Sequence, residues 1–533
     1  MKRFITYLLL TLFAGGCIKN DIPLPVVVPR ITAMDVEGAT AVNIDSEKRK
    51  VTITLDETTD IRQVNIRSIT FADEATSTSW DITGAQDLSK PIAITLTIYQ
   101  DYVWTITAEQ PIERYFTVNG QVGSSEIDVA NRRVVTYVNG STDLNNIAVT
   151  SLKLGPKDIT TYTPDPSQLH DFSDMVQVEA SYHDISEVWN IHIEQTETVV
   201  EMVSVDPWTA VVWLKASGVA DRTNGFRYRA SGAAEWIDVS GEALTVDGGT
   251  FSACVEGLQP LTSYECCAYS GDDVTEITTF QTEAAMQMPN SGFETFSNAE
   301  SSKYSSFYDP ASAVAELQTK WWDSGNKGST TVGSSYTITM PDASDKQEGS
   351  YSVKMQSQYV IIKFAAGNIF VGEFDRVIGT SGGVVNFGRP FTLRPRKLSL
   401  WLKYKNGPID RFNGAPDNDP VKEGDMDRCQ VFVALGDWDY RTYGGTPDCP
   451  VQVNTNDRTT FFKPDSDAVI GYGAYVSDKA TDGWIKVEIP IEYRSTSRKP
   501  THIIVSCAAS MLGDYFTGST QSTLWVDGMQ LEY

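Results

Sequence analysis

Aromatic side chains next to polar ones are the residues of this sequence whose types best suit ligand chemistry. They lie in two segments of the second half of the chain, and the set is Trp321, Trp322, Asp437, Trp438, Tyr440 and Tyr443. The C–H face of a sugar ring packs on an aromatic face, while its hydroxyl groups bond to polar groups at the rim. We predict that these residues bind a ligand, with the polar loop 437–443 exposed. The alternative is a core role, which strand alternation favours for one of Trp321 and Trp322.

Carboxylates could also hold a metal ion. Glu294 and Asp527 lie near the two ends of the region 289–533, where the termini of a β-sandwich meet, and carboxylate oxygens are the ligands that calcium prefers. We therefore predict a structural Ca²⁺ at this pair as the one possible cofactor. The acidic run 417–427 lacks the EF-hand spacing, so we interpret it as a solvated loop.

No catalytic residue is predicted. Residues 379–383, GTSGG, formally match a nucleophile elbow, but a strand rather than a helix follows, so a hairpin turn is expected. Hydrolysis of a glycoside would need two placed carboxylates, and 69 acidic residues do not single out a pair. Arg389 and Arg394 each precede a proline and are interpreted as structural.

The N-terminus has the pattern of an export signal. Lys2 and Arg3 precede an apolar run at 4–13, and the small residues 14–16 lead to Cys17. This arrangement predicts a signal peptide over residues 1–16, and Cys17 resembles the cysteine of a bacterial lipobox. The resemblance implies cleavage before Cys17 and acylation of that residue, with 17–28 as a tether from the lipid. The alternative is an ordinary signal peptide with an incidental cysteine.

Length and charge bound the rest of the chain. With 533 residues the sequence predicts roughly three to five domains. The 43 basic and 69 acidic residues give a net charge of −26, which argues against nucleic acid and disfavours strongly acidic glycans. Six cysteines follow Cys17 without metal-ligand spacing, and Cys429 with Cys449 is the one pairing considered.

Two similar modules follow the tether. The segment 44–51 returns as 127–134, and Trp104 with its neighbours returns as Trp189, which marks an internal duplication. Polar and apolar residues alternate in both copies, so we predict Ig-like β-sandwiches over 29–111 and 112–197. A duplicated scaffold repeats its core, and the two tryptophans are therefore expected to be buried.

The third module, 198–284, has a more specific signature. Residues 258–264, LQPLTSY, resemble the corner of fibronectin type III domains, in which the tyrosine hydroxyl bonds back to the backbone. We expect Tyr264 to form that bond. The thiols of Cys254, Cys266 and Cys267 are expected to be free, with Cys266 buried and Cys267 exposed.

The region 289–533 consists of strands separated by long loops, which predicts a jelly-roll sandwich. Its motifs are GFE at 292–294, WDSGN at 322–326, AAGNIFVGEF at 365–374, FGRPFTLRPRKLSLWLKY at 387–404, CQVFVAL at 429–435, GDYFTGS at 513–519 and LWVDGMQLEY at 524–533. Together they resemble the putative carbohydrate metabolism domain (PCMD) family of surface lipoproteins from Bacteroidota-type bacteria. The resemblance implies a jelly-roll fold akin to carbohydrate-binding modules.

These expectations combine into an all-β protein of three small sandwiches followed by a larger jelly roll. We expect a lipid anchor in the outer membrane, exposure at the cell surface, and a C-terminal domain that captures a neutral polysaccharide for an outer-membrane uptake complex. A second hypothesis is a structural or adhesive surface lipoprotein that binds a protein or cell-wall partner. A glycoside hydrolase is the third.

Overall fold

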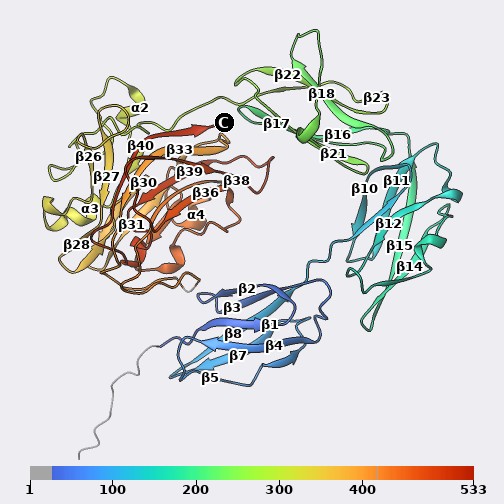
Figure 1. The fold of residues 1–533 in the computed structure, drawn as a ribbon, viewed down its shortest axis with the longest axis horizontal. Helices are drawn as coiled ribbons and strands as arrows, with labels where there is room; N and C mark the ends of the chain where they lie inside the picture. The colour runs from blue at the N-terminus through green and yellow to red at the C-terminus, as the bar shows by residue number, and fades with distance from the viewer. Residues whose placement is uncertain (1–26, 417) are drawn as a thin grey trace, which may run out of the picture. The chain divides into compact units, whose positions relative to one another are not determined.

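The computed structural model describes residues 27–416 and 418–533, and most regular structure in them is β-strand (Figure 1). The prediction of an all-β chain of sandwiches is confirmed. Cys17 and the signal peptide lie outside the described residues. The chain divides into two compact units, one ending at Glu113 and including Pro156–Ile159, the other formed by Arg114–Gly155 and Thr160–Tyr533. Among the described residues, no helix is long and apolar enough to cross a membrane.

The first module is a sandwich of two sheets, drawn in blue in Figure 1. Its strands are β1 (Ile31–Val36), β2 (Ala39–Asp45), β3 (Lys50–Leu55), β4 (Val64–Phe71), β5 (Ser77–Thr78), β6 (Gly84–Gln86), β7 (Ile92–Thr97) and β8 (Asp101–Glu109). The sheet orders are β1-β4-β6 and β2-β3-β8-β7-β5. Trp104 on β8 is fully buried between them, as expected.

The second module repeats most of the first, although none of its described strands corresponds to β6. Its strands are β9 (Tyr115–Val118), β10 (Gln121–Asp128), β11 (Arg133–Asn139), β12 (Val149–Lys153), β13 (Thr161–Thr163), β14 (Val176–Tyr182) and β15 (Ile185–Thr196). The parallel pair β3–β8 returns as β11–β15, and Trp189 is fully buried like Trp104. Gln110 donates to two carbonyls of a turn, and Gln195 does the same at the matching place. The duplication is thus visible in polar contacts as well as in the core.

The third module is a sandwich with sheet orders β16-β17-β21-β20 and β19-β18-β22-β23, and β24 also pairs with β22. Its strands are β16 (Glu201–Pro207), β17 (Val211–Ser217), β18 (Asn224–Ala230), β19 (Ile237–Asp238), β20 (Leu244–Asp247), β21 (Thr250–Glu256), β22 (Ser263–Ser270), β23 (Asp273–Val274) and β24 (Thr278–Gln281). The expected corner is formed, because the backbone N–H of Gln259 donates to the Tyr264 hydroxyl at 3.0 Å.

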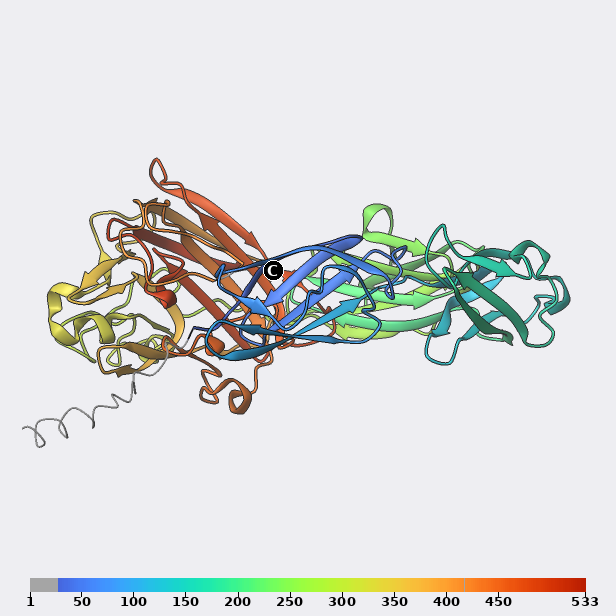
Figure 2. The ribbon, with the colours of Figure 1, turned by 90° about the horizontal axis from the view of Figure 1, so that it is seen from below.

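The C-terminal domain is a larger sandwich of a nine-stranded and a five-stranded sheet. Its strands are β25 (Trp322–Asp323), β26 (Thr339–Asp342), β27 (Ser352–Gln356), β28 (Gln358–Val360), β29 (Lys363–Ala365), β30 (Asn368–Ile378), β31 (Gly382–Phe387), β32 (Arg389–Pro390), β33 (Lys397–Lys405), β34 (Cys429–Gly436), β35 (Val451–Asn454), β36 (Val469–Ser477), β37 (Ile485–Pro490), β38 (Glu492–Tyr493), β39 (His502–Ala508) and β40 (Thr523–Glu532). Short helical turns α2 (Ala315–Gln318) and α3 (Asn326–Ser329) lie at the margin of the domain, in yellow in Figure 2, and α4 (Tyr440–Tyr443) follows β34.

The two sheets bury a common core. The central path of the large sheet is β35-β31-β30-β39-β34-β36-β38, and the small sheet is β26-β27-β40-β33-β37. Alternate residues of β34, such as Val431 and Val433, face the core, while Phe432 and Ala434 face outward into a second apolar cluster. The GTSGG segment connects β30 to β31, so its expected hairpin is confirmed.

A polar junction fixes the third module to the C-terminal domain within the second compact unit. The buried guanidinium of Arg394 donates to the carbonyls of Thr496 and Pro207, both at 2.7 Å, and pairs with Glu283 at 3.0 Å. Its cationic centre also lies 5.1 Å from the Trp208 ring centroid, and that ring packs 4.5 Å from Tyr493. The structural role predicted for Arg394 is confirmed, and the third module is more than a spacer.

The cysteines of the described residues are free thiols. The pairing considered for Cys429 with Cys449 is therefore wrong. Cys429 faces the main core from β34, whereas Cys449 lies in the loop before β35. The expectation of an exposed Cys267 is also wrong, because Cys267 is buried together with Cys266.

Candidate functional site

The outer face of the large sheet carries a pocket lined by aromatic and polar side chains. The connection from β34 to β36, residues 437–468, folds back over this face and brings α4, β35 and the 3-10 turn Arg458–Thr460 with it. Phe432 on the sheet stacks on Phe462 of the connection, with ring centroids 5.1 Å apart and an interplanar angle of 11°. Trp438 packs edge-on against the same Phe462 ring at 6.3 Å. These contacts anchor the connection to the sheet.

The pocket opens within this connection and has a volume of about 360 Å³. Its lining residues are Trp438, Thr442, Tyr443, Gly444, Val451, Gln452, Thr459, Thr460, Phe461, Phe462, Lys463 and Ser466. Four of these are aromatic, and most of the others carry hydroxyl, amide or ammonium groups. A pocket of this size holds one or two sugar rings by the usual dimensions of ligand sites.

Hydrogen bonds hold the polar groups of the pocket in place. The hydroxyl groups of Tyr443 and Ser466 are 2.7 Å apart, which joins α4 to the far end of the connection. Gln452 donates from its amide nitrogen to the side-chain oxygen of Asn386 at 3.1 Å, so its orientation is fixed by β31. The Thr460 hydroxyl receives the N–H of Asn454 at 2.8 Å. The lining is therefore preorganised rather than assembled on binding.

The structure brings together only part of the predicted ligand set. Trp438 and Tyr443 line the pocket, although Trp438 is almost fully buried and offers little ring surface. Asp437 is exposed but turned away into an ion pair, with both carboxylate oxygens 2.8 Å from Arg498. Tyr440 lies on α4 outside the lining, with Arg441 stacked over its ring.

Trp321 and Trp322 do not line the pocket. Trp322 is fully buried in the main core and donates its indole N–H to the carbonyl of Pro289 at 2.8 Å. Its prediction as a ligand-binding residue is wrong, because a ring without exposed surface cannot stack on a sugar. Trp321 is partly buried, packs against the same core and does not line the pocket.

Sequence reasoning missed Phe461, Phe462 and Gln452. The signal was present, because two adjacent aromatics stand in an otherwise polar connection, with hydroxyl residues before them. Their position over the sheet, however, depends on how a connection of some thirty residues folds back, which spacing alone does not give.

The outer face of the small sheet is also aromatic, but it is closed. The connection from β26 to β27, residues 342–351, crosses this face, and we call it the acidic loop. Three indole N–H groups donate to its carboxylates, from Trp401 to Glu348 at 2.9 Å, from Trp484 to Asp345 at 3.0 Å and from Trp525 to Asp342 at 3.1 Å. The Trp525 ring is buried under the ammonium groups of Lys354, Lys403 and Lys405.

Glu294 and Asp527 hold the same acidic loop. Glu294 accepts the backbone N–H groups of Ser350 and Tyr351, and Asp527 accepts those of Gln347 and Glu348. The donor set does not fit a calcium ion, because amide N–H groups and not oxygens face both carboxylates. Among the described residues, no group of three or more His, Cys, Asp or Glu is placed to hold a metal. Calcium stays an untested prediction.

The C-terminal domain matches a known family model. Residues 292–532 match the family model described as "Putative carbohydrate metabolism domain", PCMD. The match confirms the resemblance that the motifs indicated, and it covers the pocket and the acidic loop. No curated protein sequence matches the chain.

Solved structures similar to the chain have low scores. Two are titled putative glycoside hydrolases, from Bacteroides thetaiotaomicron VPI-5482 (17% identity, TM-score 0.31, covering 79% of this chain and 95% of that one) and from Bacteroides vulgatus ATCC 8482 (18%, 0.32, 45% and 96%). A third is a carbohydrate-binding module specific for non-crystalline cellulose, CBM28 (11%, 0.18, 40% and 88%). At TM-scores below 0.5 these likenesses carry no argument about this chain.

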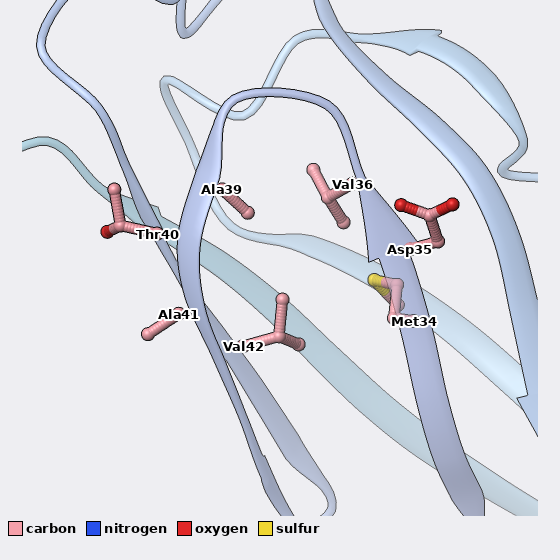
Figure 3. A pocket seen from close by; sticks show the side chains of 7 residues that line it. All are labelled: Met34, Asp35, Val36, Ala39, Thr40, Ala41 and Val42. Carbon is pink, nitrogen blue, oxygen red and sulfur yellow. The ribbon is translucent and has the colours of Figure 1, made fainter.

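A second hollow, outside the PCMD match, lies in the first module. It has a volume of about 250 Å³ and opens between β1 and β2, which belong to different sheets (Figure 3). Val36, Ala39 and Val42 lie between the two strands, while Thr40 and Ala41 point away from the gap. No aromatic ring or amide lines it, so it is the open edge of a sandwich and not a ligand site.

Proposed function

We propose that this protein is a lipid-anchored surface protein that binds a neutral polysaccharide through the pocket of its C-terminal domain. The observation that carries the proposal is the pocket lining, in which aromatic rings stand beside fixed hydroxyl and amide groups. This is the combination by which a sugar ring is recognised, since its C–H face packs on a ring and its hydroxyls exchange hydrogen bonds.

Binding is the activity that this lining supports. The lining residues that the structure describes include no Asp or Glu, and the usual glycoside hydrolysis depends on a pair of carboxyl groups flanking the bond. The lining also contains the ammonium group of Lys463, but its other polar side chains, such as Thr442, Thr459 and Gln452, are neutral donors and acceptors. Neutral groups of this kind suit an uncharged sugar, because none of them requires a charged partner.

The cellular setting is part of the same proposal. Cys17 and the segment before it support export and acylation, and the tandem sandwiches support a role in carrying the binding domain away from the membrane. The family match to a carbohydrate-related domain supports a glycan as the partner. We extend the proposal to capture at the outer-membrane surface for an uptake complex.

Affinity electrophoresis of the full chain through gels containing neutral polysaccharides tests the proposal. We expect retardation by at least one polymer. In Phe462→Ala the affinity should fall roughly tenfold, since burying an apolar side chain of this size is worth about 1.5–3 kcal/mol. Tyr440→Ala is the matched control, because this ring lies on the same connection but outside the lining. Equal loss in both variants, or no retardation on a broad panel, would contradict the proposal. A stoichiometric protein partner without glycan affinity would favour the adhesive alternative.

A further inference from the structure

Four loops meet beside the pocket and form a cluster of cations on aromatic rings. They come from the β28–β29 hairpin and from the segments 411–414, 458–461 and 515–518. The N–H of Asn413 donates to the Thr517 hydroxyl at 3.0 Å, and its side-chain amide donates to the Tyr515 carbonyl at 3.1 Å. Phe461 packs edge-on against Tyr515 with centroids 5.2 Å apart. The loops are therefore in direct contact.

Each cation of this cluster lies over one ring. Lys363 Nζ is 3.7 Å from the centroid of Phe516. The guanidinium carbon of Arg411 is 4.4 Å from the centroid of Tyr359, and that of Arg458 is 4.8 Å from the centroid of Tyr515. We call Lys363, Arg411 and Arg458, with these three rings, the cationic cluster. A guanidinium that stacks on a ring keeps its N–H groups free at the edge of its plane, where an oxyanion can accept them.

The three cations have no carboxylate within 4.0 Å among the described residues. Other cations of the domain do have such partners, since Arg498 pairs with Asp437 and Arg389 with Glu373. The absence of such a partner among the described residues is unexpected in a chain with 69 acidic and 43 basic residues. Lys363 donates to the Ser381 carbonyl and Arg411 to the Asp410 carbonyl, while the Arg458 guanidinium makes no hydrogen bond to a described residue.

Two carboxylates adjoin the cluster without neutralising it. Asp410 is held by the N–H of Thr520 at 3.0 Å and by the hydroxyl of the same residue. Asp514 precedes Tyr515, and its side chain is exposed to solvent. Among the described residues, neither carboxylate forms an ion pair with Lys363, Arg411 or Arg458, which leaves these three cations available to a ligand.

The cluster is continuous with the pocket through one side chain. Phe461 lines the pocket on one side and contacts Tyr515 of the cluster on the other. A polymer that occupies the pocket would therefore reach Arg458 within the next sugar unit or two, and the charge there would select the chemistry of that unit.

We propose that the cationic cluster is a second subsite, which binds the carboxylate or sulfate of an acidic sugar in a polysaccharide whose neutral units occupy the pocket. This inference rests on the proposed function, because it takes the neutral units of the polymer to occupy the pocket. It also refines the expectation from net charge, because a chain of −26 still presents a local cationic surface.

Matched polymers with and without charge test the proposal on the full chain. The pairs are polygalacturonate with its methyl ester, and dextran sulfate with dextran, in affinity gels at low and high salt. We expect at least tenfold stronger retention by a charged member, falling as salt screens the contact. The triple variant Lys363→Gln, Arg411→Gln, Arg458→Gln should abolish that difference. A control with the same change in charge, Arg222→Gln, Arg227→Gln, Lys486→Gln, should keep it.

Several outcomes would overturn the proposal. Equal retention by charged and neutral members, or a charge preference that survives the triple variant, removes the subsite.

Ile361 and Ile362 at the tip of the hairpin are each more than half exposed, so binding to anionic phosphatidylglycerol vesicles is measured as a further arm of the experiment. Binding to vesicles with no charged-polymer preference would assign the cluster to a membrane surface. If the full chain retains no neutral polymer but still prefers the charged members, the result would count against the pocket as the neutral binding site and not against the cationic cluster.

Discussion

The two outer faces of the C-terminal domain are both rich in aromatic residues but differ in how the polar edges of the rings are used. On the small sheet, Trp401, Trp484 and Trp525 donate their indole N–H groups to the acidic loop, and that face is closed. On the large sheet, the rings around Phe462 stack on one another and leave a pocket of about 360 Å³ beside fixed hydroxyl groups. Aromatic content alone therefore does not identify a ligand site.

The difference lies in whether a loop covers the rings. On the closed face the indole donors bond to the carboxylates of the acidic loop, so the aromatic residues there stabilise that loop. On the open face Gln452 and Thr460 also form hydrogen bonds within the protein, but they line a pocket that a ligand could fill. Substitutions on the two faces should accordingly separate stability from affinity.

The largest effect is expected for Trp525→Ala on the closed face. The ring is 6% exposed and covered by three lysines, so its removal leaves a cavity and takes away the donor to the second carboxylate oxygen of Asp342. We expect a loss of about 3–5 kcal/mol in the free energy of unfolding of this domain, measured by urea denaturation. Polysaccharide affinity of the folded fraction should not change, and a loss of affinity without a loss of stability would contradict the comparison.

On the open face, Tyr443→Ala should mainly lower affinity. The side chain is partly exposed, lines the pocket and exchanges a hydrogen bond with Ser466. We expect affinity for the retarding polymer to fall by roughly 5- to 30-fold, equivalent to about 1–2 kcal/mol, with less than about 1 kcal/mol lost in stability. Tyr443→Phe keeps the ring and should retain most of the binding in isothermal titration calorimetry.

A smaller effect on stability is expected for Glu348→Ala in the acidic loop. This change removes the acceptor of the Trp401 indole N–H but leaves the backbone N–H groups that Asp527 accepts. A single hydrogen bond to a partly exposed charged group is worth about 1 kcal/mol, so the melting temperature should fall by a few degrees. A neutral result would mean that the loop is held by its backbone contacts alone.

The stability of the closed face should depend on pH through Asp342. Burial raises the pKa of Asp342, but hydrogen bonds from Ser344 and Trp525 outweigh it, and the net pKa is lowered from 3.8. The stability that the ionised Asp342 contributes is therefore lost as the pH falls below 3.8. Melting curves from pH 3 to 8 should show this loss in the parent chain and not in Asp342→Asn.

Much of the fold could be predicted from the sequence because it depends on local patterns. Alternation and the repeat of 44–51 at 127–134 predicted the twin sandwiches, and one tyrosine predicted the corner of the third module. These features depend on strand period and turn chemistry, which neighbouring residues determine.

The site was only partly predictable because it depends on tertiary contacts. Alternation correctly warned that one of Trp321 and Trp322 is core, but not that the other also lies away from the pocket. Asp437 is next to Trp438 in sequence, yet its partner Arg498 comes from a segment 61 residues further along. Contacts with residues distant in sequence determine which polar group faces a ligand. The spacing of residues along the chain does not reveal such contacts.

The Arg394 junction decides where this chain can be cut. A fragment that begins at residue 289 would lack Pro207 and Glu283, which removes two of the three acceptors of a buried guanidinium and uncovers the Tyr493 ring that Trp208 shields. A fragment that begins near residue 200 keeps all of these partners. The smallest excisable piece that carries the pocket is therefore the third module together with the C-terminal domain.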